Sequence, residues 1–191
     1  MKYIVSIFIT LIMLSCESIK TESESEYQNC INTKTFERGI FYPINTSESE
    51  IAKSVNVFDS IKKFEEYLKN RKSLSDFSKK GYLSLISQID QTDFLKEEFS
   101  KFNSDNYFIE NNLMTSLFFE ELFYDCAISS FKNQNHYDFI LKTKDKVQLN
   151  SYPDKKILTE LINKVDFQSE TQRLIITYLI YSNLYWKYQM E

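Results

Sequence analysis

Glycine and proline are so scarce in this chain that few folds other than a helical one are open to it. The 191 residues include two glycines, Gly39 and Gly81, and two prolines, Pro43 and Pro153. Average usage would give about 13 glycines in this length. Tight hairpins and phosphate-binding loops need glycine, because their backbone takes a positive φ or closely approaches a ligand. Long helices joined by polar loops need almost none, so the shortage favours an all-α fold.

The apolar residues support the same interpretation, because from Ser47 onward they recur at intervals of three and four, as in amphipathic helices. Capping patterns open the first two expected helices, and the last is apolar on almost every side, as expected of a helix in the middle of a bundle. The segment 137–141 could be a short strand or a packed loop. We therefore expect a compact bundle of about five or six helices. The expected helices cover approximately 47–68, 73–89, 92–102, 108–132, 153–166 and 169–186.

The first 15 residues have the layout of a signal peptide. A short positive segment, Met1-Lys2-Tyr3, precedes an apolar run over 4–14. A membrane span needs about 20 apolar residues, whereas the apolar part of a signal peptide has about 7 to 15. The run is therefore too short to cross a bilayer, and we expect the mature chain to leave the cytoplasm.

The stretch Met13-Leu14-Ser15-Cys16 resembles the lipobox of bacterial lipoproteins, in which a small residue precedes a cysteine that is acylated and becomes the first residue after cleavage. Leu14 departs from the commonest pattern, which places Leu one position earlier, where this chain has Met13. The resemblance covers the first 16 residues and implies a lipid anchor at Cys16. The membrane would be a bacterial one, the outer rather than the inner, and the domain would face the periplasm or the cell surface. The alternative is a secreted protein cleaved near Ser15.

Residues 17–35 are polar and acidic and lack apolar periodicity, so they predict a flexible tether. As a coil, this segment would hold the domain roughly 25 Å from the membrane. We therefore divide the chain into three parts. Residues 1–15 are the signal peptide, and residues 47–191 are the helical domain. Residues 16–46 contain the lipid-anchored Cys16, the tether and the segment that leads into the domain.

Charge and motifs exclude several function classes. The formal net charge is -4, which offers no basic surface for nucleic acid. The chain has a single histidine, His136, and its cysteines do not have the spacing of metal ligands, so we expect no metal site. Patterns for phosphate-binding loops, nucleophile elbows and dinucleotide sites are absent from the sequence. We expect no cofactor and no enzymatic activity.

Two cysteines remain besides Cys16, namely Cys30 and Cys126. In an oxidising compartment such a pair predicts a possible disulfide, which would close a loop of about 95 residues. The alternative is that Cys126 is a small buried hydrophobe and Cys30 is free or paired elsewhere.

Two groups of side chains could carry function. Glu120, Glu121 and Asp125 lie in dense apolar sequence that could raise a carboxyl pKa, although they could equally form the polar edge of a buried helix. Four tyrosines at helical spacing line one side of the last helix, with Trp186 on a neighbouring face. If exposed, this ladder is a possible partner surface; otherwise it packs in the core. The tyrosines are Tyr178, Tyr181, Tyr185 and Tyr188.

The sequence thus predicts a membrane-tethered lipoprotein of the bacterial envelope that acts as a non-enzymatic binding or structural module. One version is an immunity-like protein that blocks a toxin in the periplasm. Two alternatives stay open. An enzyme would bring the acids of 120–125, with or without His136, into one cleft. A carrier of an apolar ligand would enclose a large apolar cavity.

Overall fold

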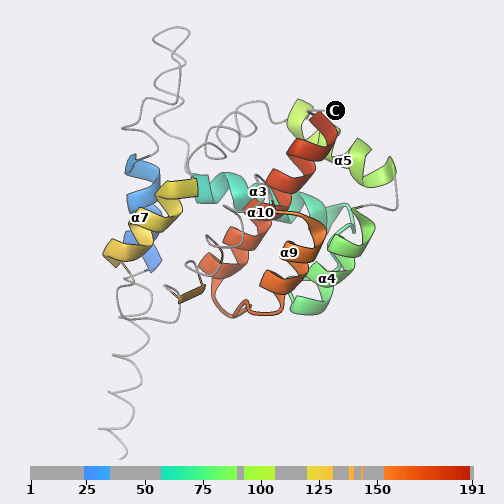
Figure 1. The fold of residues 1–191 in the computed structure, drawn as a ribbon. Helices are drawn as coiled ribbons and strands as arrows, with labels where there is room; N and C mark the ends of the chain where they lie inside the picture. Colours follow the sequence, from blue (N-terminus) through green and yellow to red (C-terminus); the bar gives the residue numbers. More distant parts are fainter. Residues whose placement is uncertain are drawn as a thin grey trace, which may run out of the picture.

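The computed structural model describes residues 24–34, 57–89, 93–105, 120–130, 138–139, 143 and 153–189. Within these ranges all regular structure is helical, so the all-α prediction is confirmed. Seven helices lie in the described part, against about five or six predicted, and the additional one covers residues 24–34. The other six are α3 (Val57–Asn70), α4 (Lys79–Gln88), α5 (Asp93–Asp105), α7 (Glu120–Ser130), α9 (Lys155–Ile162) and α10 (Glu170–Gln189) (Figure 1).

Helix α10 is the central helix of the bundle, as its sequence predicts. Every residue from 174 to 184 is buried. The helix contacts α3, α5 and α9, while α4 packs on α9 (Figure 1). An apolar helix that is covered on all sides removes a large area from water, which is the main favourable contribution to folding.

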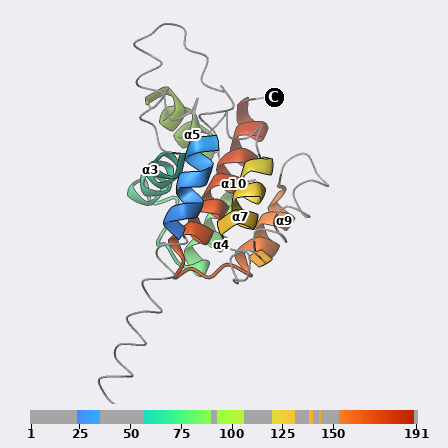
Figure 2. The ribbon, with the colours of Figure 1, turned by 90° about the vertical axis from the view of Figure 1, so that its left-hand side faces the viewer.

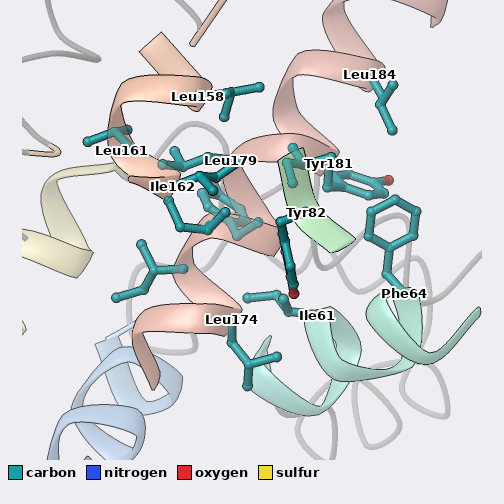
Figure 3. Close-up of a cluster of buried hydrophobic side chains, with 14 of the residues drawn as sticks. Ile61, Phe64, Tyr82, Leu158, Leu161, Ile162, Leu174, Leu179, Tyr181 and Leu184 are labelled. Carbon is teal, nitrogen blue, oxygen red and sulfur yellow. The ribbon is translucent and has the colours of Figure 1, made fainter. Parts of the chain in front are cut away.

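The core is formed where α3, α4 and α9 meet around α10. In Figure 3 the apolar side chains of α3, α4 and α9 point toward those of α10. Each helix contributes residues three or four apart, so the sequence periodicity correctly identified the buried faces. The labelled members are Ile61, Phe64, Tyr82, Leu158, Leu161, Ile162, Leu174, Leu179, Tyr181 and Leu184.

The predicted start of the second helix is wrong, because α4 begins at Lys79 and not at the capping pattern of 73–76. Ser78 is the N-cap, and its hydroxyl accepts a hydrogen bond from the backbone N–H of Gly81 at 3.3 Å. A Cβ at Gly81 would lie 2.2 Å from the carbonyl oxygen of Asp76, so only glycine fits there. The tight packing of this glycine is against the connection before α4 and not against another helix.

Residues 71–74 instead form the turn that ends α3. Lys72 has a φ of 64°, in the left-handed region that commonly terminates helices. The backbone N–H of Leu74 donates to the carbonyl of Leu68 at 3.0 Å, which satisfies a carbonyl at the helix end. The buried Leu74 therefore anchors the turn.

The tether prediction is wrong for residues 24–34, which form a helix on the body of the protein. Tyr27 and Ile31, four residues apart on one face, are both fully buried. Figure 2 shows this helix between α3 and α7, in front of α10. Residues 17–23, 35 and the rest of 16–46 lie outside the described ranges.

The later helices agree better with the sequence. Helices α5 and α10 begin within one residue of their predicted starts, and α9 begins two residues after Pro153. The Asp154 carboxylate caps α9 by accepting from the N–H of Ile157 at 2.7 Å, so Pro153 precedes the cap. Of the segment 137–141, the structure describes residues 138–139, and they are helical.

We expect Ile31→Ala to lower the free energy of unfolding by about 2–5 kcal/mol, because it deletes a fully buried side chain. Thr33→Ala is the matched control, since Thr33 is exposed on the same helix. Urea unfolding of both variants measures the difference. Equal stability of Ile31→Ala and the wild-type protein would show that this helix is not part of the folded core.

Candidate functional site

The tyrosine ladder on α10 runs from the core to the edge of the bundle. Tyr178 and Tyr181 are 1% and 0% exposed, whereas Tyr185, Trp186 and Tyr188 are half-buried. The ladder as a whole is therefore not a surface. Its first half packs inside the protein, and its second half is partly accessible.

Tyr181 is held by both its ring and its hydroxyl. Its ring meets that of Phe64 edge-on, with 5.1 Å between the ring centroids, and that of Phe99 at 5.2 Å. The hydroxyl donates to Oδ1 of Asn103 at 3.1 Å. A buried tyrosine needs such a partner for its hydroxyl, so the contacts explain why tyrosine is tolerated in this core.

We call residues 185–188, from Tyr185 to Tyr188, the aromatic end of α10. The Tyr188 hydroxyl and the Lys187 ammonium both donate to the carbonyl oxygen of Ile89, at 2.9 and 3.0 Å. The rings of Tyr185 and Trp186 meet at nearly a right angle, with centroids 6.2 Å apart. These contacts hold the side chains in place while part of each stays accessible, which suits contact with another protein.

Of the three acids predicted as candidate catalytic groups, only the side chain of Asp125 is described. It is half-buried, and one carboxylate oxygen lies 3.9 Å from Nζ of Lys34 on helix 24–34. The side chains of Glu120 and Glu121, and all of His136, lie outside the described part of the structure. Asp125 thus contributes to the junction between α7 and helix 24–34.

Two buried acids were not predicted from the sequence, and Glu65 on α3 is the more deeply buried of the two. Its side chain is 1% exposed and accepts from Nε of Arg173 at 2.7 Å and Nη2 at 3.3 Å. The Tyr82 hydroxyl also donates to Glu65 and lies 2.7 Å from that of Thr177. Burial, followed by the negative charge of Glu65, raises the pKa of Tyr82 well above its usual value. This network joins α3, α4 and α10.

The second buried acid is Glu98 on α5, whose side chain is 6% exposed. Two N–H groups of Arg71 and the hydroxyl of Tyr67 donate to it, the latter at 2.8 Å. The hydrogen bonds from Arg71 lower the pKa of Glu98, although burial opposes them. Burial and the bond to Glu98 raise the pKa of Tyr67 to about 12. Glu98 is therefore a charged group that ties α5 to the end of α3.

One signal in the sequence could have revealed both acids. Glu65 follows Ile61 by four residues, and Glu98 follows Leu95 by three, so each lies on the apolar face of its helix. A carboxylate on that face needs a cationic partner. Two of the three arginines in the chain, Arg71 and Arg173, fill this role.

The structure joins Cys30 and Cys126 in a disulfide, with 5.7 Å between the two Cα atoms. The bond connects helix 24–34 to α7 across 96 positions of sequence. Cys126 is fully buried, and Cys30 is partly accessible.

No family model, curated protein or solved structure matches this chain. Within the described residues, no three His, Cys, Asp or Glu side chains gather as metal ligands would. None of the described helices combines the length and the apolar character that a membrane crossing needs. Two features of the described residues are therefore candidates for function. They are the partly accessible aromatic end of α10 and the N-terminal helix that the disulfide links to α7.

We expect Glu98→Gln to lower the free energy of unfolding at pH 7 by about 2 kcal/mol, because it removes charge-assisted hydrogen bonds. The folded-state pKa of Glu98 is lowered, so its stabilisation is present above the unfolded pKa and is lost as pH falls through the folded value. The difference from wild type should therefore shrink toward zero in urea titrations carried from pH 7 into the acid range.

Glu97→Gln is the control for this experiment, because Glu97 is an exposed neighbour on the same helix. It should change stability by less than about 0.5 kcal/mol. A Glu98→Gln deficit that stayed constant down to the lowest pH would contradict the ion-pair account.

Proposed function

We propose that this protein is a lipid-anchored module of the bacterial envelope, held through an acylated Cys16, that binds a partner protein or supports the envelope without catalysing a reaction. The observation that carries the proposal is the Cys30–Cys126 disulfide. Such bonds persist in oxidising compartments and are rare in the bacterial cytoplasm. The bond agrees with the export signal over 1–15 and with the lipobox-like residues that end at Cys16.

The helix at 24–34 brings the domain closer to the membrane than a longer coil would. Eight peptide steps separate Cys16 from Glu24, and fully extended they reach at most about 28 Å, less than half the extended length of the 19-residue tether expected from the sequence. Glu24 accepts from the Ser169 hydroxyl at 2.8 Å, so the anchored end of the domain includes the start of α10. The 20 residues of α10 rise about 30 Å.

The aromatic end therefore lies at the far end of α10 from the anchored end. Figure 2 shows the first turn of helix 24–34 and the last turn of α10 at opposite ends of the body. Aromatic side chains with polar tips, held in place and partly accessible, are typical of protein interfaces. We propose that an envelope protein docks on this end. An immunity-like protein is one form of the proposal, in which the docked protein is a toxin.

The buried acids support a module without catalysis. Glu65 and Glu98 are each engaged by an arginine and a tyrosine that link helices. Groups bonded in this way stabilise the fold and are not placed to exchange protons with a substrate. We therefore assign Glu65 and Glu98 to structure and the accessible aromatic rings to recognition.

The anchor is tested by expressing the full chain in a bacterium and analysing its membrane fraction by mass spectrometry. We expect the mature protein to begin at an acylated Cys16. Cys16→Ser should block acylation and remove the mature protein from detergent extracts of the membrane. Cys126→Ser is the control, because it alters a cysteine without removing the lipidation signal. An unmodified Cys16 in the wild-type membrane fraction would refute the lipid anchor.

The partner surface is tested with Trp186→Ala in affinity capture from the envelope fraction, followed by titration of the partner that is recovered. We expect the dissociation constant to rise at least about tenfold, because a central aromatic anchor often contributes 2 kcal/mol or more. Ile128→Ala is the matched control, since Ile128 is an apolar side chain 44% exposed on α7. An equal loss of affinity in both variants, or no loss in either, would contradict binding at the aromatic end.

A further inference from the structure

Helix 24–34 completes the ends of two core helices. The side-chain oxygen Oδ1 of Asn32 accepts from the backbone N–H of Val57, the first residue of α3, at 3.0 Å. Ser169 caps α10 by accepting from the N–H of Gln172 at 3.3 Å, and its hydroxyl donates to Glu24. The first N–H groups of a helix have no partner within the helix, so this N-terminal helix contributes directly to two helix starts.

The same helix covers part of the core. The fully buried Tyr27 meets the ring of Phe58 on α3 edge-on, with centroids 6.0 Å apart. Gln28 Nε2 donates to the Thr171 hydroxyl at 3.4 Å, and Thr171 is itself fully buried. Removal of the helix would expose these groups near the starts of α3 and α10.

Helix 24–34 is held to the body by these contacts, by the buried Ile31, by the Lys34–Asp125 ion pair and by the disulfide. An isolated helix of its 11 residues is marginal in water, so its helical state depends on docking. The disulfide fixes Cys30 of this helix against Cys126 of α7, and so limits the positions that the helix can take when it is not docked.

We infer that helix 24–34 is an oxidation-gated clasp, which stays closed on α3, α7 and α10 only while Cys30 and Cys126 are bonded. With both thiols reduced, the helix leaves the body, whereas the core of α3, α4, α9 and α10 stays folded. The clasp helix lies directly behind the proposed anchor, so an exported chain would close it only after reaching an oxidising compartment. That last step rests on the proposed envelope location, whereas the gate itself does not.

The closing reaction is a thiol–disulfide exchange with an oxidant that is itself a protein disulfide. The partly accessible Cys30 attacks the oxidant as a thiolate, which breaks the oxidant's S–S bond and forms a mixed disulfide. The Cys126 thiolate then attacks the Cys30 sulfur. The Cys30–Cys126 bond forms, and the oxidant leaves as a dithiol carrying the two electrons and, after protonation, the two protons of the original thiols.

The gate is tested by hydrogen exchange with mass spectrometry on the full chain in detergent, with and without excess dithiothreitol. We expect reduction to speed exchange of the amides of 24–34 by about a hundredfold or more. The amides of 174–184, in the centre of α10, should change far less. Reduction that leaves 24–34 protected overturns the gate, and so does reduction that exposes both segments equally, because the bond would then hold the whole fold.

Two variants separate the bond from other effects of the reductant. The double variant Cys30→Ser, Cys126→Ser should show fast exchange over 24–34 without dithiothreitol and no further response to it. Lys34→Ala removes the ion pair with Asp125 between the same two helices and should leave 24–34 protected when oxidised. Opening in Lys34→Ala as large as in the double variant would overturn the role of the disulfide. None of these outcomes depends on acylation of Cys16.

Discussion

The buried ion pair between Glu65 and Arg173 is the contact on which the arrangement of the bundle depends. Helix α10 is apolar over most of its surface, and apolar contacts alone are not directional. A buried carboxylate is costly unless it is paired and hydrogen-bonded, so a shift of α10 by one residue would strand a charge. The additional bonds of Tyr82 with Glu65 and Thr177 extend the same constraint to α4. The pair therefore sets the register of α10 against α3 and α4.

This register also determines what the other end of α10 presents. Tyr181 lies eight residues after Arg173 and enters the aromatic cluster with Phe64 and Phe99. Tyr188 follows seven residues later, within 6.3 Å of the Phe99 ring, and bonds the carbonyl of Ile89. The partly accessible rings are thus positioned by contacts that begin at a buried charge about 20 Å away along the helix.

Much of the fold, but little of the candidate site, could be predicted from the sequence. Helix α10 was predictable because its apolar residues are dense and continuous, and α5 and α9 because their stripes are regular. The start of α4 was not, since Ser73 opens a capping pattern that the helix does not use, Ser78 is the cap, and Gly81 fits tightly against Asp76. The ion pairs of Glu65 and Glu98 were not predictable, because periodicity does not indicate which charges meet across the fold. Arg173, for example, is 108 positions from Glu65.

Helix 24–34 shows the limit of sequence reasoning most clearly. Only Tyr27 and Ile31 mark its buried face, which is too few for a periodic pattern, and its stability comes from groups supplied by distant helices. The disulfide changes how this segment is connected to the body. The bond between Cys30 and Cys126 closes a covalent loop that contains residues 31–125. A force applied at Glu24 would therefore be transmitted to α7 through the disulfide and to α3 through the main chain. The segment nearest the proposed anchor is therefore bound to the body by two covalent routes.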